Sequence, residues 1–413
     1  MTNKEKGMRA DRTGSNPSDI RQRNRALVLK LIALRQHVSR VELARMIGLT
    51  KTTLGNIVAE LVENGLVNEL NAKNSNGNTN LGRRPIELRI SDKSPCICGI
   101  LIRRDQCTGI VADLTGQILF RISSVIPTSV SSDSLITLIL DLITDLQRCC
   151  NRKLIAIGVA SMGPVDVTAQ KIVNPPNFYG IQDVSISAII KNKTGLPSYL
   201  IHDADAGALA EYLYGHSSDI RNFIYLHIRN GIGAGYILQG QLYRGDLGQC
   251  GEIGHTSINY SGPLCECGNN GCLELYANVT KMNQKIKHLK GILNQSPANE
   301  VLNGDFTWEE IVRASANDDF LAVSALDEFC TYLAYALANT INLLDVNHIL
   351  IGYDSTVTST KIEKMLEDKL NTRVLVAKNR KVIVKRSVFG GDAPLIGSVA
   401  QITDLIFQGK ILI

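Results

Sequence analysis

The stretch GHTSINYSGPLCECGNNGC, residues 254–272, restricts the fold more than any other part of the chain, because it gathers three cysteines and a histidine. The N-terminal sequence MTNKEKGMRADRTGSNPSDIRQRNR is polar and lacks the apolar core of a signal peptide. We therefore expect a cytoplasmic protein, in which thiols stay reduced. In that compartment a dense Cys/His cluster is typical of a metal site rather than of disulfides.

The spacing of the four candidate ligands, H-x9-C-x-C-x4-C, suits a single ion. Thiolate and imidazole bind tetrahedral zinc well, and four protein ligands leave no open position for water. The segment therefore predicts one structural zinc ion per chain, and the alternative is a loop of reduced cysteines without metal. The predicted metal ligands are His255, Cys265, Cys267 and Cys272.

Charge is distributed unevenly along the chain. Residues 1–90 hold sixteen Lys and Arg against eight Asp and Glu, whereas the remaining residues hold 28 against 31. A basic segment in front of a slightly acidic body indicates a module that meets a polyanion, and the alternative is a solubilising tail. No apolar run reaches the length of about 18 residues that a membrane span needs, so no membrane insertion is expected.

The first ninety residues have the pattern of a small helical domain. Residues 1–20 lack apolar periodicity and predict a disordered basic tail. A helical stripe begins at Asn24, and Ser39 with Glu42 forms a capping box for a short second helix. Thr50 can cap a third helix that stops at Gly65.

Two strands, LVNEL and LGRRPIELRI, follow these helices, so residues 21–90 predict a winged helix-turn-helix DNA-binding domain. In that arrangement the polar start of the third helix enters the major groove, and the arginines of the wing enter the minor groove. The alternative is a three-helix interaction module without DNA. The predicted DNA-contacting residues are Lys51, Thr52, Thr53, Asn56, Arg83 and Arg84.

After residue 90 the pattern changes to apolar strands that alternate with helical stretches. CICGILI, LIAIGVA and FIYLHI read as buried strands, and SDSLITLILDLITDLQRCC reads as an amphipathic helix. This alternation indicates an α/β body over residues 91–413, and its length accommodates two lobes.

The metal segment GEIGHTSINYSGPLCECGNNGCLE resembles the signature of the ROK family of repressors, open reading frames and sugar kinases. GVASMGPVD, NPPN, HDADAGALAE, GIGAG and GGDAPLIGSVA follow the family's other landmarks in order. The resemblance runs from about residue 24 to the end, and it implies an actin-like, ribonuclease-H-like body with a sugar between two lobes. Lobe I would span about 91–200 plus 388–413, and lobe II about 201–387.

The resemblance also implies the sugar contacts. His255 would bind the metal by one ring nitrogen and the sugar by the other, and His202 stands where the family usually has Asn. Carboxylates and imidazoles suit vicinal hydroxyls, which they bind as acceptors and donors. The implied sugar-binding residues are Gly163, Asn174, His202, Asp203, Glu252, His255 and Glu274.

A sugar kinase of the same family is the alternative enzyme. It requires Asp203 as general base and two loops whose backbone amides hold ATP phosphates. The first loop of the family resembles D-x-G-G-T, but this chain has Leu-Ile-Arg-Arg-Asp at 101–105. The second resembles G-T-G-x-G-x-G but reads RNGIGAG at 229–235. Bulky side chains thus replace both phosphate loops, and Arg103 with Arg104 would instead support a contact between lobes or domains.

The expected function is a sugar-responsive DNA-binding regulator and not an enzyme. It would act as a repressor of carbohydrate uptake or catabolism genes, released from double-stranded operator DNA by a monosaccharide or sugar phosphate. Two-fold operators call for paired modules, so we expect a homodimer or homotetramer. A regulator controlled by a protein partner instead of a sugar is the remaining alternative.

Overall fold

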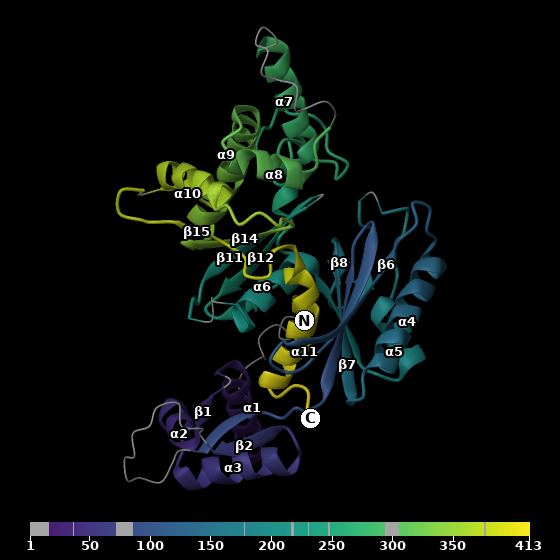
Figure 1. Cartoon of the computed structure of the whole chain (residues 1–413), viewed down its shortest axis with the longest axis vertical. Coiled ribbons are helices and arrows are strands. Elements are labelled where there is room, and N and C mark those ends of the chain that lie inside the picture. The colour runs from purple at the N-terminus through teal and green to yellow at the C-terminus, as the bar shows by residue number, and fades with distance from the viewer. Residues whose placement is uncertain are drawn as a thin grey trace, which may run out of the picture. The chain divides into compact units, whose positions relative to one another are not determined.

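The computed structural model describes residues 16–35, 37–71, 86–176, 178–215, 219–229, 231–246, 248–293, 305–375 and 377–413. The chain forms two compact units, Met1–Ser94 together with Thr403–Ile413, and Pro95–Ile402. We call the first the N-terminal unit and the second the body; Figure 1 traces both along the chain.

The N-terminal unit has helices and strands in the order of a winged helix-turn-helix. Its strands form an antiparallel sheet in the order β1-β3-β2. The elements are α1 (Pro17–Arg35), β1 (Val38–Ser39), α2 (Arg40–Ile47), α3 (Lys51–Glu63), β2 (Val67–Asn71) and β3 (Ile86–Ile90).

Two details of this unit differ from the sequence prediction. The prediction of disorder as far as residue 20 is wrong for its last part, because α1 already begins at Pro17. The rigid φ angle of proline and its missing N–H suit the first turn of a helix. Val38 pairs with Leu88 in β1, a strand that the sequence did not predict. A strand of two residues leaves no periodicity in a sequence.

The predicted helix starts are confirmed by their hydrogen bonds. Ser39 and Glu42 form the capping box, in which the Glu42 backbone N–H donates to Ser39 Oγ at 3.2 Å and the Ser39 backbone N–H donates to Glu42 Oε2 at 2.8 Å. Thr50 Oγ1 accepts a hydrogen bond from the Thr53 backbone N–H and caps α3. Gly48 ends α2 with φ +73°, which is the left-handed conformation that glycine adopts without strain. The turn between α2 and α3 is therefore encoded locally.

The last residues of the chain group with the N-terminal unit, and not with lobe I as expected. The side-chain amide of Gln22 donates to the Gly409 carbonyl. Arg25 Nη2 donates to the Ile413 carbonyl at 2.8 Å. Through these contacts with α1, residues Thr403–Ile413 belong to the N-terminal unit.

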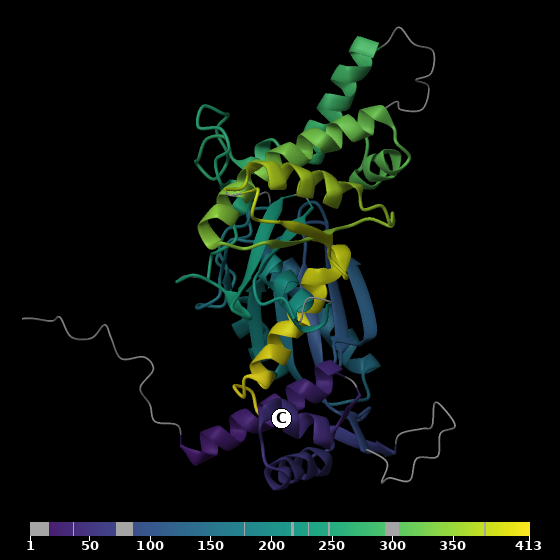
Figure 2. The same ribbon diagram turned by 90° about the vertical axis from the view of Figure 1, so that its left-hand side faces the viewer.

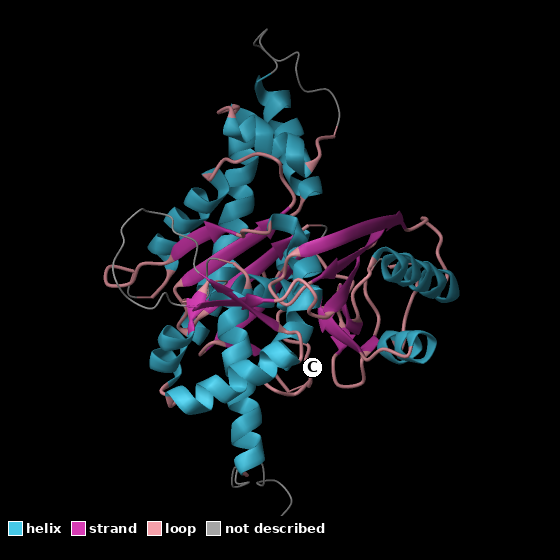
Figure 3. Cartoon of the chain, turned by 60° about the horizontal axis from the view of Figure 1, so that its bottom comes forward, coloured by secondary structure: helices cyan, strands magenta, loops and turns pink. Residues whose placement is uncertain are grey.

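The first lobe of the body is built on a five-stranded sheet in the order β10-β7-β4-β5-β6. Figure 3 shows two helices, α4 and α5, beside this sheet. The elements are β4 (Cys96–Ile102), β5 (Gln106–Ala112), β6 (Ile118–Val125), α4 (Ser132–Cys149), β7 (Leu154–Ser161), the small pair β8 (Val165–Asp166) and β9 (Lys171–Ile172), α5 (Ile186–Thr194) and β10 (Ser198–His202).

Opposite faces of β4 pack against different helices, since successive side chains of a strand alternate. Cys98 and Ile100 are fully buried in a core that also holds Leu142 of α4. On the other face, a Cβ atom at Gly99 would lie 2.3 Å from Ser398 Oγ of α11 (Ala393–Phe407). The C-terminal helix α11 therefore packs against the sheet of the first lobe.

The second lobe has a sheet in the order β13-β12-β11-β14-β15, covered by a layer of helices that Figure 2 shows stacked above it. Its elements are α6 (Asp203–Leu213), β11 (Phe223–Ile228), β12 (Ile232–Leu238), β13 (Gln241–Tyr243), η1 (Ile253–His255), η2 (Leu273–Leu275), α7 (Val279–Leu293), α8 (Trp308–Ala316), α9 (Phe320–Leu344), β14 (His348–Tyr353), α10 (Lys361–Arg373), β15 (Ile383–Arg386) and η3 (Gly390–Asp392).

One helix among the described residues, α9, is long and apolar enough to cross a membrane by length and composition alone. It packs against α7, α8 and α10, and Leu326, Cys330 and Leu337 of α9 are fully buried in the core of the lobe. Its apolar character is thus accounted for by packing within the body.

Candidate functional site

Three parallel strands of the first lobe end at the same level of the sheet. Ile102 of β4 pairs with Ser161 of β7, and Ser161 pairs with His202 of β10. The carboxyl edge of a parallel sheet is where α/β proteins place ligand sites. The residues that follow this edge line an open cavity, whose empty volume together with the adjoining solvent space is about 710 Å³.

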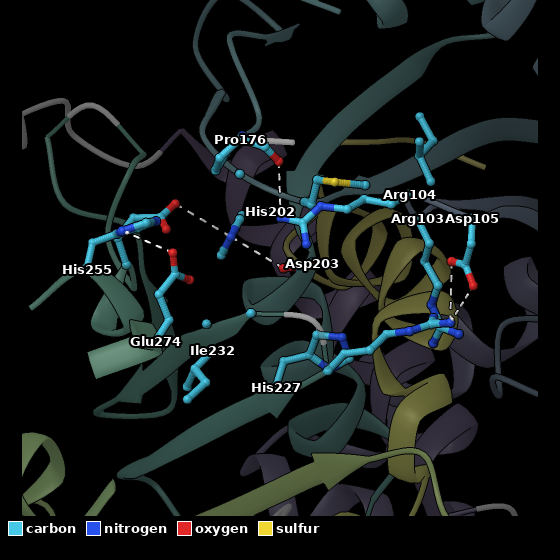
Figure 4. Close-up of a pocket in the computed structure, with 17 residues that line it drawn as sticks. Arg103, Arg104, Asp105, Pro176, His202, Asp203, His227, Ile232, His255 and Glu274 are labelled. Carbon is cyan, nitrogen blue, oxygen red and sulfur yellow. Dashed lines mark hydrogen bonds and ion pairs between the residues drawn. The ribbon is translucent and has the colours of Figure 1, made fainter. Parts of the chain in front are cut away.

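The opposite wall of the cavity comes from the second lobe. His227 of β11, the start of β12 and the two short helices η1 and η2 supply it. Figure 4 shows Asp203 and His202 facing His255 and Glu274 across the cavity. The complete lining is Ile102, Arg103, Arg104, Asp105, Met162, Gly163, Pro176, His202, Asp203, His227, Arg229, Gly231, Ile232, Gly233, Glu252, His255 and Glu274.

The structure brings all of the predicted sugar-binding residues to this lining except Asn174. Asn174 is exposed, and Pro176 from the same loop lines the cavity in its place. A Cβ atom at Gly163 would lie 2.4 Å from Glu252 Oε1, so a side chain there would have to displace the Glu252 carboxylate. Glycine at this position lets the backbone approach the carboxylate.

His202 is the buried centre of the acidic end of the cavity. Its Nε2 atom lies 3.3 Å from Asp203 Oδ1 and 3.8 Å from Glu252 Oε1. Burial alone would lower the pKa of His202, but the carboxylates of Asp203 and Glu252 outweigh it and raise the pKa. The ring therefore has a raised tendency to carry a proton and donate to a ligand oxygen.

Burial shifts the pKa of two further groups that line the cavity, His227 and Glu274. Burial lowers the pKa of His227 to about 4, which leaves its ring neutral at pH 7. Burial also raises the pKa of Glu274, against the opposing effect of His255, whose Nδ1 lies 3.6 Å from Glu274 Oε1. The cavity thus offers both donors and acceptors, as recognition of vicinal hydroxyls requires.

The four predicted metal ligands converge. One ligand atom from each of them lies within 4.8 Å of all the others. His255 Nδ1 is 3.7 Å from Cys265 Sγ, and Cys267 Sγ is 3.6 Å from Cys272 Sγ. The Asn269 side chain holds the segment by donating to the His255 carbonyl at 3.2 Å.

This donor set fits a tetrahedral ion. With metal–sulfur and metal–nitrogen bonds of about 2.3 and 2.0 Å, neighbouring ligand atoms of a tetrahedron lie about 3.5–3.8 Å apart. The two measured separations, 3.6 and 3.7 Å, agree with that edge length. All cysteines of the chain are free thiols in this structure, and Cys96 and Cys98 are core residues of β4, as predicted.

Arginines line the end of the cavity at the two segments that the sequence analysis compared with phosphate loops. Arg229 Nη2 lies 3.1 Å from Asp105 Oδ2, and Arg103 Nη1 lies 3.8 Å from Asp354 Oδ2. Both pairs join the first lobe to the second, so the expectation of an interlobe contact is confirmed for Arg103. Arg104 Nη2 instead donates to the Pro176 carbonyl at 3.1 Å.

Sequence reasoning missed Pro176, His227 and Arg229 as lining residues. The NPPN motif marked the loop of Pro176 but pointed to its asparagine. His227 lies within the apolar run FIYLHI, where a histidine has no distinguishing signal. Arg229 was noted only as a departure from a glycine-rich pattern.

In the N-terminal unit, α3 has one polar and one apolar face. Leu54, Ile57, Val58 and Leu61 are buried against the unit. The predicted DNA-contacting residues of this helix are all exposed, namely Lys51, Thr52, Thr53 and Asn56. The predicted wing residues Arg83 and Arg84 lie outside the described residues.

A model of the ROK family matches residues 97–404. The xylose repressor of Bacillus spizizenii is 31% identical over 382 residues, covering 92% of this chain and 94% of that protein. The N-acetylglucosamine repressor of Escherichia coli O157:H7 is 28% identical over 396 residues, covering 95% of each.

Solved structures agree with these relatives. A ROK family transcriptional regulator, a homolog of the E. coli MLC protein, superposes with a TM-score of 0.77 at 26% identity, covering 94% of this chain and 97% of that one. A ROK family glucokinase from Streptomyces griseus, in complex with glucose and AMPPNP, has a TM-score of 0.65 at 22% identity. It covers 74% of this chain and 98% of its own, and it shows the fold of the body alone.

Proposed function

This chain belongs to the ROK family, and from that premise we propose that it is a DNA-binding transcriptional repressor whose operator affinity is controlled by a sugar. One observation carries the proposal. The same chain contains a helix-turn-helix whose third helix, α3, has an exposed polar face, and a cavity lined by carboxylates and imidazoles. Relatives that match it over nearly their whole length are named xylose repressor and N-acetylglucosamine repressor.

The DNA contact is assigned to α3 of the N-terminal unit. Lys51 at its start is suited to a phosphate, and Asn56 one turn on is suited to a base edge. The N-terminal end of a recognition helix is the part that reaches base edges in this motif. Arg83 and Arg84 remain predicted wing contacts to the minor groove.

The sugar is assigned to the cavity of the body. Asp203, Glu252 and Glu274 are acceptors for sugar hydroxyls, and His202 is the buried donor among them. A polar site of this kind rejects ligands that lack a hydroxyl, because its own groups are then left unpaired. Asn174 is dropped from the direct contacts, since it does not line the cavity.

Zinc is the metal that the His/Cys cluster would hold, through His255, Cys265, Cys267 and Cys272. Four protein ligands make this a structural ion that fixes the loop rather than a catalytic one. His255 also lines the cavity, so metal binding orients one wall of the sugar site.

A kinase is disfavoured by the side chains at the nucleotide end. Arg103 and Arg229 fill this region and pair with carboxylates across the lobes, whereas phosphate loops require small residues and free backbone amides. Asp203 would then serve as a sugar ligand and not as a general base.

The proposed control follows from linkage. Sugar between the lobes favours a closed body, and closure in a homodimer or homotetramer moves the DNA-binding units away from the spacing that a two-fold operator requires. The sugar weakens DNA binding only as far as it prefers the closed state. The proposed site of action is the cytoplasm. The second candidate mode of control is a protein partner that regulates DNA binding in place of the sugar.

The test is a gel-shift titration with fragments from upstream of the chain's own gene and its neighbours. A fragment bound with nanomolar affinity is then titrated with monosaccharides and their phosphates. The account predicts release by one of them, and it predicts that Asp203→Asn binds the same fragment but is not released. Asp145→Asn, an exposed carboxylate on α4, is the matched control and should be released normally. A fragment that no sugar releases would favour a protein partner, and the absence of any bound fragment would contradict the repressor assignment.

A further inference from the structure

We infer that Cys267 is an oxidation site, at which a hydroperoxide forms a disulfide between Cys267 and Cys272 and zinc is released from the cluster. The inference rests on the proposed zinc ligands, and its effect on the cavity rests on the proposed sugar site. It adds a modification site and a redox input to the proposed regulation. Hydrogen peroxide is the simplest oxidant of this class.

Solvent exposure distinguishes Cys267 from the other two thiols of the cluster. Cys265 is 4% exposed and Cys272 is fully buried, whereas Cys267 is exposed. A Cβ atom built at the neighbouring Gly268 would meet no atom within 4 Å, so the space beside Cys267 is open. A dissolved oxidant can therefore reach one sulfur of the cluster directly.

Metal ligation gives Cys267 a reactivity that exposure alone does not. A cysteine loses its proton when it binds a metal ion, and the thiolate rather than the thiol is the nucleophile. Susceptibility to oxidation follows thiolate character and exposure together. Cys149 is the other exposed thiol of the chain, and it lies outside the four-residue cluster. It therefore serves as an internal comparison that has the exposure without the metal.

Cys272 is placed to supply the second sulfur of the disulfide. Its Sγ atom lies 3.6 Å from Cys267 Sγ. An S–S bond of about 2.05 Å requires the two atoms to approach by about 1.5 Å. The open space beside Gly268 leaves room for Cys267 to make this movement, whereas Cys272 is enclosed by the body.

The two chemical steps balance in atoms and electrons. The Cys267 thiolate attacks one oxygen of hydrogen peroxide, the O–O bond breaks with loss of hydroxide, and Cys267 becomes a sulfenic acid. The Cys272 thiolate then attacks the Cys267 sulfur, and the S–O bond breaks with loss of a second hydroxide as the disulfide forms. The two sulfurs lose two electrons, which the peroxide gains. His255 and Cys265 are then the only two ligands left, too few to retain Zn²⁺.

The oxidised segment carries one wall of the cavity. His255 Nδ1 lies 3.7 Å from Cys265 Sγ, and the same residue lines the cavity. Cys272 Sγ lies 3.3 Å from the His255 carbonyl oxygen, and Glu274 of the cavity follows Cys272 by two residues. Loss of the metal removes the contact that orients the His255 ring, so sugar binding should weaken.

The test uses the full-length, zinc-loaded protein and an excess of hydrogen peroxide. A chromogenic chelator measures the released zinc, and alkylation followed by peptide mass analysis locates the disulfide. We expect zinc release with a Cys267–Cys272 disulfide, both reversed by a thiol reductant and added zinc. Xylose, glucose and N-acetylglucosamine are titrated by calorimetry. A sugar that binds the reduced protein should bind the oxidised protein about tenfold more weakly.

Three variants assign the chemistry to individual sulfurs. Cys267→His keeps four zinc ligands and removes the exposed sulfur, so it should release zinc about tenfold more slowly. Cys149→Ser is the matched control and should release zinc at the unmodified rate. Cys272→His removes the second sulfur, so peroxide should leave a sulfenic acid at Cys267 that dimedone traps. Zinc content and thermal melts check each variant before oxidation, and the peptide map of the unmodified protein decides the site even where a variant fails to load zinc.

Three outcomes would overturn the inference. Zinc release from Cys267→His at the unmodified rate would place the oxidation elsewhere. A peptide map that shows a Cys265–Cys267 disulfide, or oxidation confined to Cys149, would exclude the assigned pair. Oxidised protein that lacks zinc but binds its sugar with an unchanged Kd would contradict the link to the cavity. The absence of sugar binding by the reduced protein would instead contradict the proposed sugar control, and zinc release and the peptide map would still decide the oxidation site.

Discussion

Arg229 Nη2 in the turn after β11 lies 3.1 Å from Asp105 Oδ2 in the turn after β4, so an ion pair bridges the two lobes at the end of the cavity. Arg229 Nε lies 3.6 Å from Asp354 Oδ2 and extends the bridge to the end of β14. Side chains from both segments that the sequence analysis compared with phosphate loops thus form ion pairs with each other. This arrangement is the basis for our proposal that the chain is not a kinase.

The first prediction concerns catalysis. Purified protein mixed with ATP, magnesium and each monosaccharide should release no ADP above the background of Asp203→Asn, because Arg103 and Arg229 occupy the region that ATP phosphates need. A coupled ADP assay measures this directly. Turnover that Asp203→Asn abolishes would mean that Asp203 is a general base and that the assignment as a non-enzyme is wrong.

The second prediction concerns the metal cluster. Cys265→Ser should lose bound zinc and lower the melting temperature of the body by about 5 °C, because a structural ion contributes folding free energy. Elemental analysis gives the occupancy, with about one zinc per chain expected in the unmodified protein. Cys149→Ser, an exposed thiol away from the cluster, serves as the control. Full occupancy in Cys265→Ser would remove this residue from the ligand set.

The third prediction concerns DNA contact by α3. Lys51→Ala should weaken binding about equally for operator and unrelated DNA and reduce the salt slope by about 1, as expected for loss of one phosphate contact. Asn56→Ala should cost about 1–3 kcal/mol on the operator only, as expected for loss of a base contact. Fluorescence anisotropy over a range of salt concentrations measures both effects.

The control for this series is Lys93→Ala, an exposed lysine of the N-terminal unit that follows β3 and is not part of α3. It should leave operator affinity within twofold of the unmodified protein. Arg83→Ala with Arg84→Ala tests the predicted wing separately and should lower operator affinity without changing sugar affinity. Unchanged operator binding by Lys51→Ala and Asn56→Ala together would exclude α3 as the recognition helix.

The fourth prediction concerns pH. Asp205 is fully buried in α6, its two carboxylate oxygens have no hydrogen-bond partner among the described residues, and burial raises its pKa to about 7. His202 and Arg244 lower the pKa in opposition, and Asp203 and Glu252 raise it further. The folded state therefore binds a proton that the unfolded chain, with a pKa of about 3.9, releases.

The sign follows from linkage. A raised pKa in the folded state means that the contribution of Asp205 to stability rises as pH falls from 8 toward 5. Asp205→Asn removes this titration, so it should unfold less readily than the unmodified protein at pH 8, by about 4 kcal/mol, and the difference should shrink to about 1–2 kcal/mol at pH 5. Chemical denaturation at both pH values measures it, with Asp145→Asn as the exposed control. An equal effect of Asp205→Asn at both pH values would mean that Asp205 does not titrate in this range.

Local signals in the sequence identified much of the fold. The capping box of Ser39 and Glu42 and the cap at Thr50 are short-range features, and both helices begin there in the structure. The apolar run CICGILI became β4 with the same bounds, Cys96–Ile102. The His/Cys segment converged because its ligands lie close in the chain.

Features that depend on distant parts of the chain were harder to predict. The two-residue strand β1 exists only because β3 pairs with it. The presence of Pro176 in the cavity, and the absence of Asn174 from it, depend on how one loop folds over the sheet edge. Arg104 stands in a segment that the sequence analysis aligned with a phosphate loop, but its hydrogen bond to the Pro176 carbonyl emerged only from the tertiary structure.

The central claim is that sugar and operator binding are coupled, and calorimetry tests it most directly. The Kd of the effector sugar is measured for the full-length protein alone and with saturating operator DNA. Reciprocity requires that operator weakens sugar binding by the same factor by which sugar weakens operator binding, and a factor of about 5–150 is typical of such coupling. An operator that leaves the sugar Kd unchanged would contradict the account.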